Sequence, residues 1–353
     1  MTESSDTTAV REAHRFDEAR LAAWLESHVA GYAGPLTVRQ FKGGQSNPTY
    51  RLDTPAHSYV LRRKPMGKLL AGAHAADREA RVQQALATTG FPVPIVHALC
   101  TDYAVIGSWF YVMDRVEGRI FWDATLPAIA REERRWYFDA MNETIARLHI
   151  VDYAAIGLAD YGKPGNFFAR QIQRWSRQYL GDAEAGRDLH MDRLIEWLPA
   201  HIPPGDETSL THGDFRIDNM IFDPVEPRVI AVLDWELSTL GHPLADFAYH
   251  LLMYRMPPGL LASLAGADLA QLDIPTEEQY VAAYCRRTGR PSIPHIDSYI
   301  VFNLFRLAAI LHGIKGRIAR GNAASAQAER TAAGLPLLTE LAWKLAAGVR
   351  PGA

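Results

Sequence analysis

The chain has 353 residues, of which 48% are hydrophobic and 22% charged, values of an ordinary globular protein with room for two lobes. Its formal net charge of -3 argues against a nucleic-acid partner. No apolar run approaches the ~18 residues of a membrane span, and residues 1–15 lack the apolar stretch of a secretory signal. The only cysteines, Cys100 and Cys285, lie far apart, so we expect reduced thiols and a cytoplasmic protein without a membrane partner.

The amino-terminal third reads as strands with interspersed helices. The first residues, to about residue 12, have the composition of a disordered segment, and a short helix follows Asp17. A strand-like pattern interrupted by turns runs from Leu36 to Leu61, and a helix is expected over 73–87. Two further strand-like runs lie near 104–106 and 109–113, before a polar connection.

Long helices dominate from Gly118 onward. Apolar residues at helical spacing predict a helix over 131–149, and a short hairpin is expected between residues 220 and 233. The pattern predicts an α+β architecture. A small, β-rich N-lobe would comprise residues 1–117, and a larger, α-helical C-lobe residues 118–353.

The strongest chemical signal is the run 211–219, THGDFRIDN. Phosphoryl transfer needs a carboxylate that accepts or orients the proton of the acceptor hydroxyl, and oxygen ligands that hold Mg²⁺ on the phosphates. Asp214 and Asn219 have the D-x-x-x-x-N spacing of a kinase catalytic loop. Asp234 ends the second strand of the predicted hairpin, which would return it beside Asn219 as a second hard oxygen ligand. The alternative is that the aspartates form turns and a helix cap.

Residues flanking the candidate base and a glycine pair upstream complete the pattern. His212 is included in the catalytic loop, where we expect it to brace the chain through hydrogen bonds and not to bind metal. Gly43, Gly44 and Ser46 lie between two predicted strands, where small residues let backbone N–H groups approach a phosphate. A Gly-Gly pair is also a common hairpin turn.

A candidate phosphate-binding cation ends the strand-like run YVLR. Strand alternation places Arg62 and Val60 on the same face. Arg62 would then lie beside the phosphates and Val60 beside the adenine. Lys64 shares this parity and is the alternative cation. Glu79 lies on the inward face of the expected helix, where a carboxylate needs a partner, and Arg62 is the obvious one. The alternative is a solvated pair with a neighbouring arginine.

Together these residues resemble the aminoglycoside phosphotransferase family, which also includes enzymes similar to choline kinase and homoserine kinase. HGDFRIDN followed by LDW is similar to the family signature, and the likeness covers about residues 41–252. The resemblance implies a two-lobed, protein-kinase-like fold with ATP and Mg²⁺ as cofactors. Asp214 would be the catalytic base, and Asn219 and Asp234 would be the magnesium ligands.

The same resemblance assigns the remaining site residues. Arg62 would clamp the phosphates with Glu79 as its partner. The segment 111–116, with Met113 and Val116, would be the hinge whose backbone holds adenine. Asp246 would be a loop brace and not a catalyst.

Longer runs, among them LRRKPMGKLL, GKPGNFFARQIQRW and DWELSTLGHPLADFAY, resemble the kinase-like domain fused to some acyl-CoA dehydrogenases. That subgroup is implicated in phosphorylating hydroxyacyl-CoA compounds, so the resemblance implies a functional link to an acyl-CoA dehydrogenase. Asp234 is followed by Trp-Glu instead of Phe-Gly, and no A-P-E segment is present, which argues against a protein kinase.

The acceptor is expected to be a small molecule with a hydroxyl group that contacts the helices of the C-lobe. Arg174 lies on an arginine-rich helix after Gly162, and Arg306 lies within an apolar helix. A polycationic aminoglycoside would be matched by carboxylates, so these arginines favour an anionic acceptor. The alternatives are arginines paired with local acids, an aminoglycoside or amino-alcohol kinase, and an inactive kinase-like binding module.

Overall fold

A computed structural model describes residues 6–42, 47–65, 76–201, 203, 205–259, 262–321 and 326–349. The chain divides into two compact units. The first runs to residue 120 and includes 154–158 and 219–238; the second comprises the remaining residues. The predicted lobe boundary at residue 117 therefore lies close to the end of the first continuous segment, to which the structure adds two later segments.

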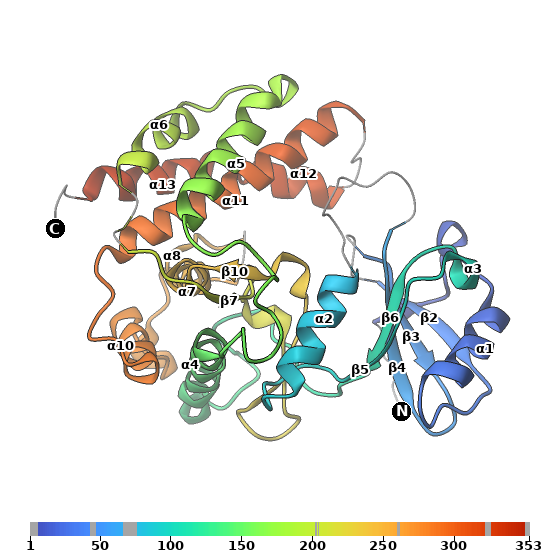
Figure 1. Ribbon diagram of the computed structural model, residues 1–353. Coiled ribbons are helices and arrows are strands. Elements are labelled where there is room, and N and C mark those ends of the chain that lie inside the picture. Colours follow the sequence, from blue (N-terminus) through green and yellow to red (C-terminus); the bar gives the residue numbers. More distant parts are fainter. Residues whose placement is uncertain are drawn as a thin grey trace. The chain divides into compact units, whose positions relative to one another are not determined.

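The first unit is built on a six-stranded antiparallel sheet (Figure 1). Its strands lie in the order β1-β2-β3-β4-β6-β5. Their bounds are β1 Thr7–Thr8, β2 Thr37–Phe41, β3 Thr49–Asp53, β4 Ser58–Arg63, β5 Val96–Cys100 and β6 Phe110–Asp114. Central β4 pairs with β3 and β6, so its side chains alternate between two covered faces.

Helices cover both faces of this sheet. They are α1 Glu18–His28, α2 Ala76–Ala87 and α3 Tyr103–Ile106. Leu61 of β4 packs in an apolar cluster with Leu25 of α1, whereas its neighbour Val60 packs with Ala80 of α2. Arg62 has the parity of Val60, so the strand directs it toward the face covered by α2.

Two local predictions in this unit are wrong, and one strand was not predicted. Residues 104–106, expected as a strand, belong to helix α3, because the Asp102 side chain accepts a hydrogen bond from the Ala104 N–H and Gly107, at φ +76°, ends the helix. Strand β5 precedes it and was not expected. Residues 7–8, expected to be disordered, pair with β2 as strand β1.

The predicted hairpin consists of β8 (Met220–Phe222) and β9 (Val229–Val232) and belongs to the first unit. Phe222 exchanges two backbone hydrogen bonds of 2.8 Å with Arg119, directly after the last strand segment of the sheet. A Cβ at Gly118 would collide with the Phe222 carbonyl oxygen. The close approach of these two backbones therefore requires glycine at position 118. The two hydrogen bonds between Phe222 and Arg119 anchor the hairpin.

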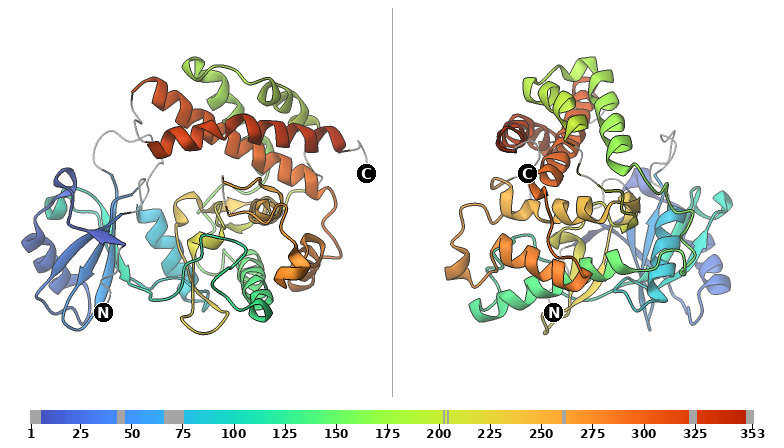
Figure 2. Two further views of the ribbon diagram at one scale, coloured as in Figure 1. Left: turned by 180° about the vertical axis from the view of Figure 1, so that it is seen from behind. Right: turned by 60° about the vertical axis from the view of Figure 1, so that its left-hand side comes forward.

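The second unit is mostly helical (Figure 2). Its helices are α4 Arg134–Ile150, α5 Phe167–Gly181, α6 Leu189–Trp197, α7 Pro243–His250, α8 Leu252–Arg255, α9 Leu269–Leu272, α10 Glu277–Thr288, α11 Ile296–Ala319, α12 Ala326–Ala333 and α13 Leu335–Gly348. Strands β7 (Ser209–Thr211) and β10 (Thr239–Gly241) form a small antiparallel ladder. The helix predicted over 131–149 is α4, which follows a 3-10 turn.

Helix α11 is the central element of this unit. It packs against α13, α7 and α5, and its residues 298–305 are buried almost without interruption. A helix that is apolar around most of its circumference needs neighbours on several sides, which α11 has. None of the helices in the described part of the chain is both long and apolar enough to cross a bilayer.

Candidate active site

The run THGDFRIDN begins as strand β7 and leaves the ladder at His212. Gly213 has φ +84°, in the left-handed region that residues with a Cβ rarely adopt. Glycine at position 213 therefore allows the chain to turn sharply immediately before Asp214.

A buried carboxylate on α7 holds this turn. Asp246 accepts hydrogen bonds of 2.8 Å from the backbone N–H groups of both His212 and Gly213, and its Oδ2 lies 3.2 Å from Nε2 of His149. Burial raises the pKa of Asp246, but the hydrogen bond and charge of His149 together with His212 outweigh burial, and the pKa is lowered. Asp246 has the contacts expected of a loop brace.

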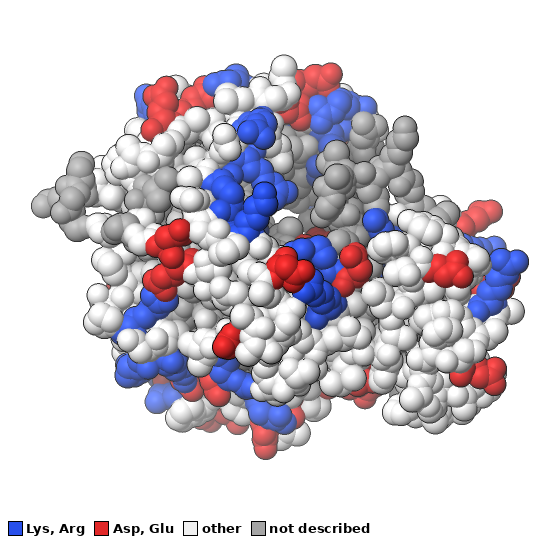
Figure 3. Space-filling model, viewed as in Figure 1, with Lys and Arg blue, Asp and Glu red and all other residues white. Residues whose placement is uncertain are grey.

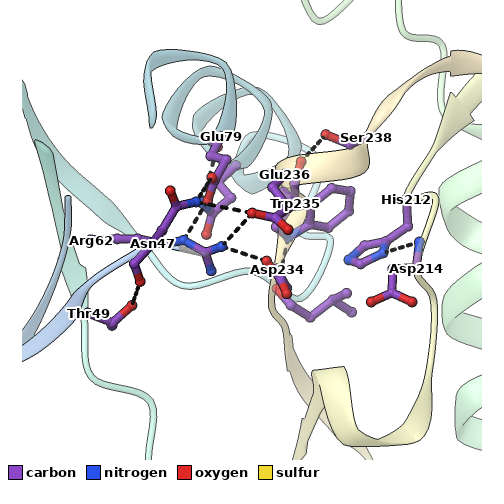
Figure 4. A network of polar contacts seen from close by, with 12 residues as sticks. Asn47, Thr49, Arg62, Glu79, His212, Asp214, Asp234, Trp235, Glu236 and Ser238 are labelled. Carbon is purple, nitrogen blue, oxygen red and sulfur yellow. Dashed lines mark hydrogen bonds and ion pairs between the residues drawn. The ribbon is translucent and has the colours of Figure 1, made fainter. Parts of the chain in front are cut away.

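His212 is fully buried, and its ring makes a contact within the same loop. Its ring Nδ1 accepts a hydrogen bond of 3.2 Å from the backbone N–H of Asp214 (Figure 4). This contact fits the bracing role expected for His212.

Side chains of the second unit hold the Asp214 carboxylate. The Tyr249 hydroxyl donates a hydrogen bond of 2.6 Å to Oδ1, and Nε of Arg216 lies 3.2 Å from the same oxygen. Nη2 of Arg216 also lies 3.0 Å from Oδ2 of Asp218. The candidate base is thus held from α7 and from its own loop.

Arg306 has a partner of a kind that the sequence did not indicate. Its Nη2 donates a hydrogen bond of 2.7 Å to the carbonyl oxygen of Gly213, and its guanidinium carbon lies 5.3 Å from the centre of the Tyr249 ring. The sequence predicts either a protein carboxylate or the substrate as its partner. Instead, a backbone carbonyl and an aromatic face satisfy the half-buried arginine.

The first unit contains a second polar group, the Arg62 cluster, formed by Asn47, Arg62, Glu79, Asp234 and Glu236 (Figure 4). Nε of Arg62 lies 2.9 Å from Glu79, and its Nη2 donates a hydrogen bond of 2.6 Å to Asp234 and lies 3.6 Å from Glu236. Burial lowers the pKa of Arg62, but the charges of Glu79, Tyr111 and Asp234 outweigh this, so the pKa is raised and Arg62 stays a cation.

Glu79 is the buried anchor of the Arg62 cluster, with 1% of its surface exposed. Besides Arg62, it accepts hydrogen bonds of 3.1 Å from Asn47 and 3.0 Å from the Tyr111 hydroxyl. Burial raises the pKa of this carboxyl, and Arg62 opposes the rise. The rival cation lies elsewhere: the Lys64 ammonium sits 5.6 Å from the centre of the Trp109 ring.

Asn219 and Asp234 flank the β8–β9 hairpin. The Leu233 N–H donates a hydrogen bond of 2.8 Å to the Asn219 carbonyl, which brings the two ends of the hairpin together. Asp234 has φ +66°, a conformation that aspartate tolerates better than most residues, and about a third of its side chain is exposed. One amide and one carboxylate oxygen are hard donors, so these two residues fit Mg²⁺.

The other predicted nucleotide contacts are placed less directly. Met113 lies in β6 opposite Val60, on the sheet face covered by α2, and half-buried Val116 follows in the connection after β6. Tyr111, predicted to be part of the hinge, instead directs its hydroxyl to Glu79 from within β6. Gly43, Gly44 and Ser46 lie outside the described residues.

Arg174, the second predicted substrate contact, lies exposed on α5, with its guanidinium carbon 5.0 Å from the centre of the Trp175 ring. No carboxylate among the described residues pairs with Arg174 or with Arg177 one turn later. The alternative in which local acids neutralise the arginines therefore does not hold for Arg174 and Arg177.

Sequence reasoning missed several side chains that touch the predicted site residues, among them Asn47, Arg216, Glu236 and Tyr249, as well as the contact of Tyr111 with Glu79. One of them had a readable signal. Tyr249 follows Asp246 by three residues on α7, so both lie on one face of that helix and reach the same loop.

The sequence model of the phosphotransferase enzyme family, APH, matches residues 37–293, well over half of the chain. The chain belongs to this family. An APH-family structure from Ralstonia eutropha JMP134, named as a candidate aminoglycoside phosphotransferase, shares 49% identity and superposes with a TM-score of 0.87, covering 95% of this chain and 100% of that one.

More distant solved structures share only the fold. Choline kinase from Cryptosporidium parvum Iowa II has 12% identity and a TM-score of 0.62, with 92% of this chain and 99% of that chain covered. A thermostable mutant of aminoglycoside phosphotransferase APH(4)-Ia, solved with ADP and hygromycin B, has 16% identity and a TM-score of 0.60, with 93% and 98% covered. The predicted α+β, protein-kinase-like fold is confirmed, and this fold binds nucleotide in the latter relative.

Curated relatives of this APH-family chain are longer. Acyl-CoA dehydrogenase family member 11 of Gallus gallus is 45% identical over 329 residues, which are 90% of this chain and 42% of the relative. Acyl-CoA dehydrogenase family member 10 of Mus musculus is 42% identical over 344 residues, 97% of this chain and 32% of the relative. The chain thus spans less than half the length of these relatives, and the predicted resemblance to their kinase-like domain is confirmed.

Proposed function

We propose that the chain is an ATP- and Mg²⁺-dependent kinase that phosphorylates a hydroxyl of a small, anionic molecule. The observation that carries this proposal is the arrangement around Asp214. In a chain of a phosphotransferase family, a carboxylate follows a left-handed glycine in a loop braced by buried Asp246. A catalytic carboxylate must be held before the substrate arrives, and these contacts hold it.

Asp214 would accept the proton of the acceptor hydroxyl as that oxygen bonds to the γ-phosphorus and the bond between this phosphorus and the bridging oxygen of ADP breaks, so that ADP leaves. Asn219 and Asp234 would hold the metal ion through their side-chain oxygens. Arg62, kept charged and in place by Glu79, binds the phosphate oxygens. Mg·ATP, when bound, supplies the transferred phosphoryl group.

An anionic acceptor is supported by the charge on α5. Lys and Arg side chains gather over this helix (Figure 3), and Arg174 and Arg177 have no carboxylate partner in the described part of the chain. The start of α5 lies close to the catalytic loop, since a Cβ at Gly241 of β10 would meet both Phe167 of α5 and Thr211 of β7. Cations without a carboxylate partner on a helix that begins near the catalytic loop favour an acceptor that carries phosphate or carboxylate groups.

A hydroxyacyl-CoA has both the hydroxyl and the anionic groups that this reading needs. The relatives named acyl-CoA dehydrogenase family members 10 and 11 support this substrate class, because they contain a similar region within a longer chain. We propose a functional link to an acyl-CoA dehydrogenase on the same ground. The enzyme would phosphorylate the hydroxyl of an acyl-CoA thioester that would otherwise be available to such a dehydrogenase.

The test is an acceptor screen that follows ADP release with Mg·ATP as donor. The panel comprises 3- and 4-hydroxybutyryl-CoA, choline, homoserine and kanamycin, with Asp214→Asn as the matched blank. We expect turnover of a hydroxyacyl-CoA and none of kanamycin. Efficient phosphorylation of kanamycin would overturn the anionic acceptor and favour the amino-alcohol alternative, to which the name of the Ralstonia eutropha relative points.

Besides turnover of a hydroxyacyl-CoA or of kanamycin, the third outcome of the screen is no turnover at all, and nucleotide binding then decides the conclusion. If the chain binds Mg·AMP-PNP but transfers phosphate to no member of the panel, the proposed acceptor class is wrong. If it binds no nucleotide, the kinase proposal itself fails and a nucleotide-independent binding module replaces it.

A further inference from the structure

Tyr249 is a buried tyrosine whose hydroxyl meets the candidate base. Its surface is 7% exposed, and its hydroxyl donates a hydrogen bond of 2.6 Å to Oδ1 of Asp214. Burial first, and the Asp214 charge second, raise the pKa of Tyr249 well above its usual range, so the hydroxyl keeps its proton and remains a donor. Hydrogen bonds to a carboxylate are shorter and about twice as strong as neutral ones.

Arg306 connects this tyrosine to the backbone of the catalytic loop. Its guanidinium lies over the Tyr249 ring, at 5.3 Å from the ring centre, while Nη2 binds the Gly213 carbonyl at 2.7 Å. One side chain of α11 therefore contacts both the residue that precedes the base and the residue that donates to it.

The two helices that carry these side chains are held in register nearby. Asn303, one turn before Arg306 on α11, donates a buried hydrogen bond of 2.8 Å to the carbonyl oxygen of Ala245 on α7. A buried hydrogen bond of this kind resists sliding of one helix along the other, because a slip would break it, although the same amide also donates to the Tyr299 carbonyl within α11. Tyr249 and Arg306 thus approach the loop from a fixed support.

We infer that Tyr249 is a positioning residue of phosphoryl transfer, which locks the Asp214 carboxylate in one orientation with Arg306 as its support. The inference rests on the proposed function, in which Asp214 is the base. A carboxylate rotates readily about its terminal bond. A short hydrogen bond to Oδ1, from a ring held by Arg306, fixes the plane of the group and with it the direction of Oδ2.

The kinetic test uses Tyr249→Phe, which keeps the ring beneath Arg306 and removes only the donor. The control is Tyr254→Phe on α8, which loses a hydrogen bond to the Pro275 carbonyl far along the chain from the loop. With 3-hydroxybutyryl-CoA as acceptor, we expect kcat of Tyr249→Phe to fall about 10- to 100-fold. KM and the Kd of Mg·AMP-PNP should stay within about twofold, as should all constants of Tyr254→Phe.

Variants of Arg306 separate positioning from folding. Arg306→Lys keeps a cation over the ring and should recover part of the kcat that Arg306→Met loses, at an unchanged KM. A kcat of Tyr249→Phe within about twofold of the wild type would overturn the inference. So would a rise in KM without a fall in kcat for Arg306→Met, because that would make Arg306 a substrate contact.

Crystal structures of the wild type and Tyr249→Phe test the same inference without any acceptor. We expect one Asp214 orientation in the wild type and a rotated or multiple orientation in the variant. An unchanged carboxylate in the variant would overturn the inference. If the screen finds no acceptor but Asp214 moves in the variant, the acceptor proposal fails and the positioning inference stands.

Discussion

The Arg62 cluster and the loop around Asp214 are both held by buried carboxylates, but their carboxylates have different partners. In the Arg62 cluster, one guanidinium is shared by Glu79, Asp234 and Glu236, and Asp234 is about one third exposed. In the loop, Asp246 is almost fully buried and binds two backbone N–H groups that cannot move without moving the chain.

This difference indicates which region responds to a ligand. A guanidinium that bridges several carboxylates can change partners when a metal ion and phosphates arrive, because each exchange replaces one charged contact with another. Backbone donors offer no such exchange. We therefore expect the Arg62 cluster to rearrange on nucleotide binding and the Asp214 loop to keep its geometry.

Asp234→Ala should have the largest effect, because it removes a charged metal ligand from the region that is expected to respond. Calorimetric titration with Mg·AMP-PNP should show affinity reduced by more than about 10-fold. Asp53→Ala, which removes a carboxylate paired with Arg51 in the same unit, is the control and should bind normally. An unchanged affinity for Asp234→Ala would leave this residue only its structural contact with Arg62, because its side chain does not cap the following turn.

Asp246→Ala tests the other side of the comparison. The variant leaves two buried N–H groups and His149 without their acceptor, so we expect the free energy of unfolding to fall by about 3 kcal/mol. Urea denaturation measures this loss. Asp297→Ala removes an exposed ion pair with Arg255 and should change stability by less than about 1 kcal/mol. Equal losses in the two variants would contradict a special role for Asp246.

Acid should destabilise the unit that contains the loop through its buried histidines. Burial lowers the pKa of His242 and of His250 to about 4, so both stay neutral in the folded chain while the unfolded chain binds protons below about 6.5. Stability should therefore fall as the pH drops from about 6.5 toward 4, by at most about 1.4 kcal/mol per pH unit for each histidine.

Denaturation at pH 7 and pH 5 checks this expectation, with His250→Gln as the comparison. His250 lies 3.1 Å from the Phe215 carbonyl and 2.7 Å from the Tyr280 hydroxyl, contacts that suit a neutral ring. The variant should lose part of the pH dependence. The pKa of Asp246 is lowered in the folded chain, so its ionised carboxylate stabilises the fold at any pH above the usual pKa range of aspartate. This contribution is lost only in stronger acid, as the pH falls through the lowered pKa.

Tyr111→Phe should have the smallest effect. Glu79 loses one neutral donor but keeps Asn47 and Arg62, so we expect a loss of about 1 kcal/mol in stability and a modest rise in the Kd of Mg·AMP-PNP. Tyr103→Phe, at an exposed tyrosine, is the control. A loss as large as that of Asp246→Ala would mean that the Arg62 cluster is as rigid as the loop.

The sequence predicted those features that depend on local periodicity. Strand parity placed Arg62 on the face of Val60, and helix spacing placed Glu79 inward, so their proximity could be expected before the structure. The hairpin that joins Asn219 to Asp234 was readable for the same reason. Helix α3 was not, because a four-residue helix depends on a cap and not on a pattern.

Contacts that form only in the folded chain could not be predicted. The sequence indicated that Arg306 needs a partner, but a backbone carbonyl carries no signature in the sequence, so Gly213 could not be foreseen. The spacing of Tyr249 from Asp246 could have placed it on the face of α7 that reaches the loop, but its hydrogen bond to Asp214 forms only in the folded chain. Glu236 was visible beside Asp234, but its approach to Arg62 depends on the turn that follows β9.

In the proposed mechanism, Asp214 performs the chemistry while the Arg62 cluster binds the nucleotide. The most direct measurement is the turnover of Asp214→Asn with an acceptor from the screen, together with its Kd for Mg·AMP-PNP. We predict a kcat lower by about 10²- to 10⁴-fold with Kd within about twofold of the wild type. Turnover within about threefold of the wild type, or loss of nucleotide binding in proportion to activity, would contradict this division of roles.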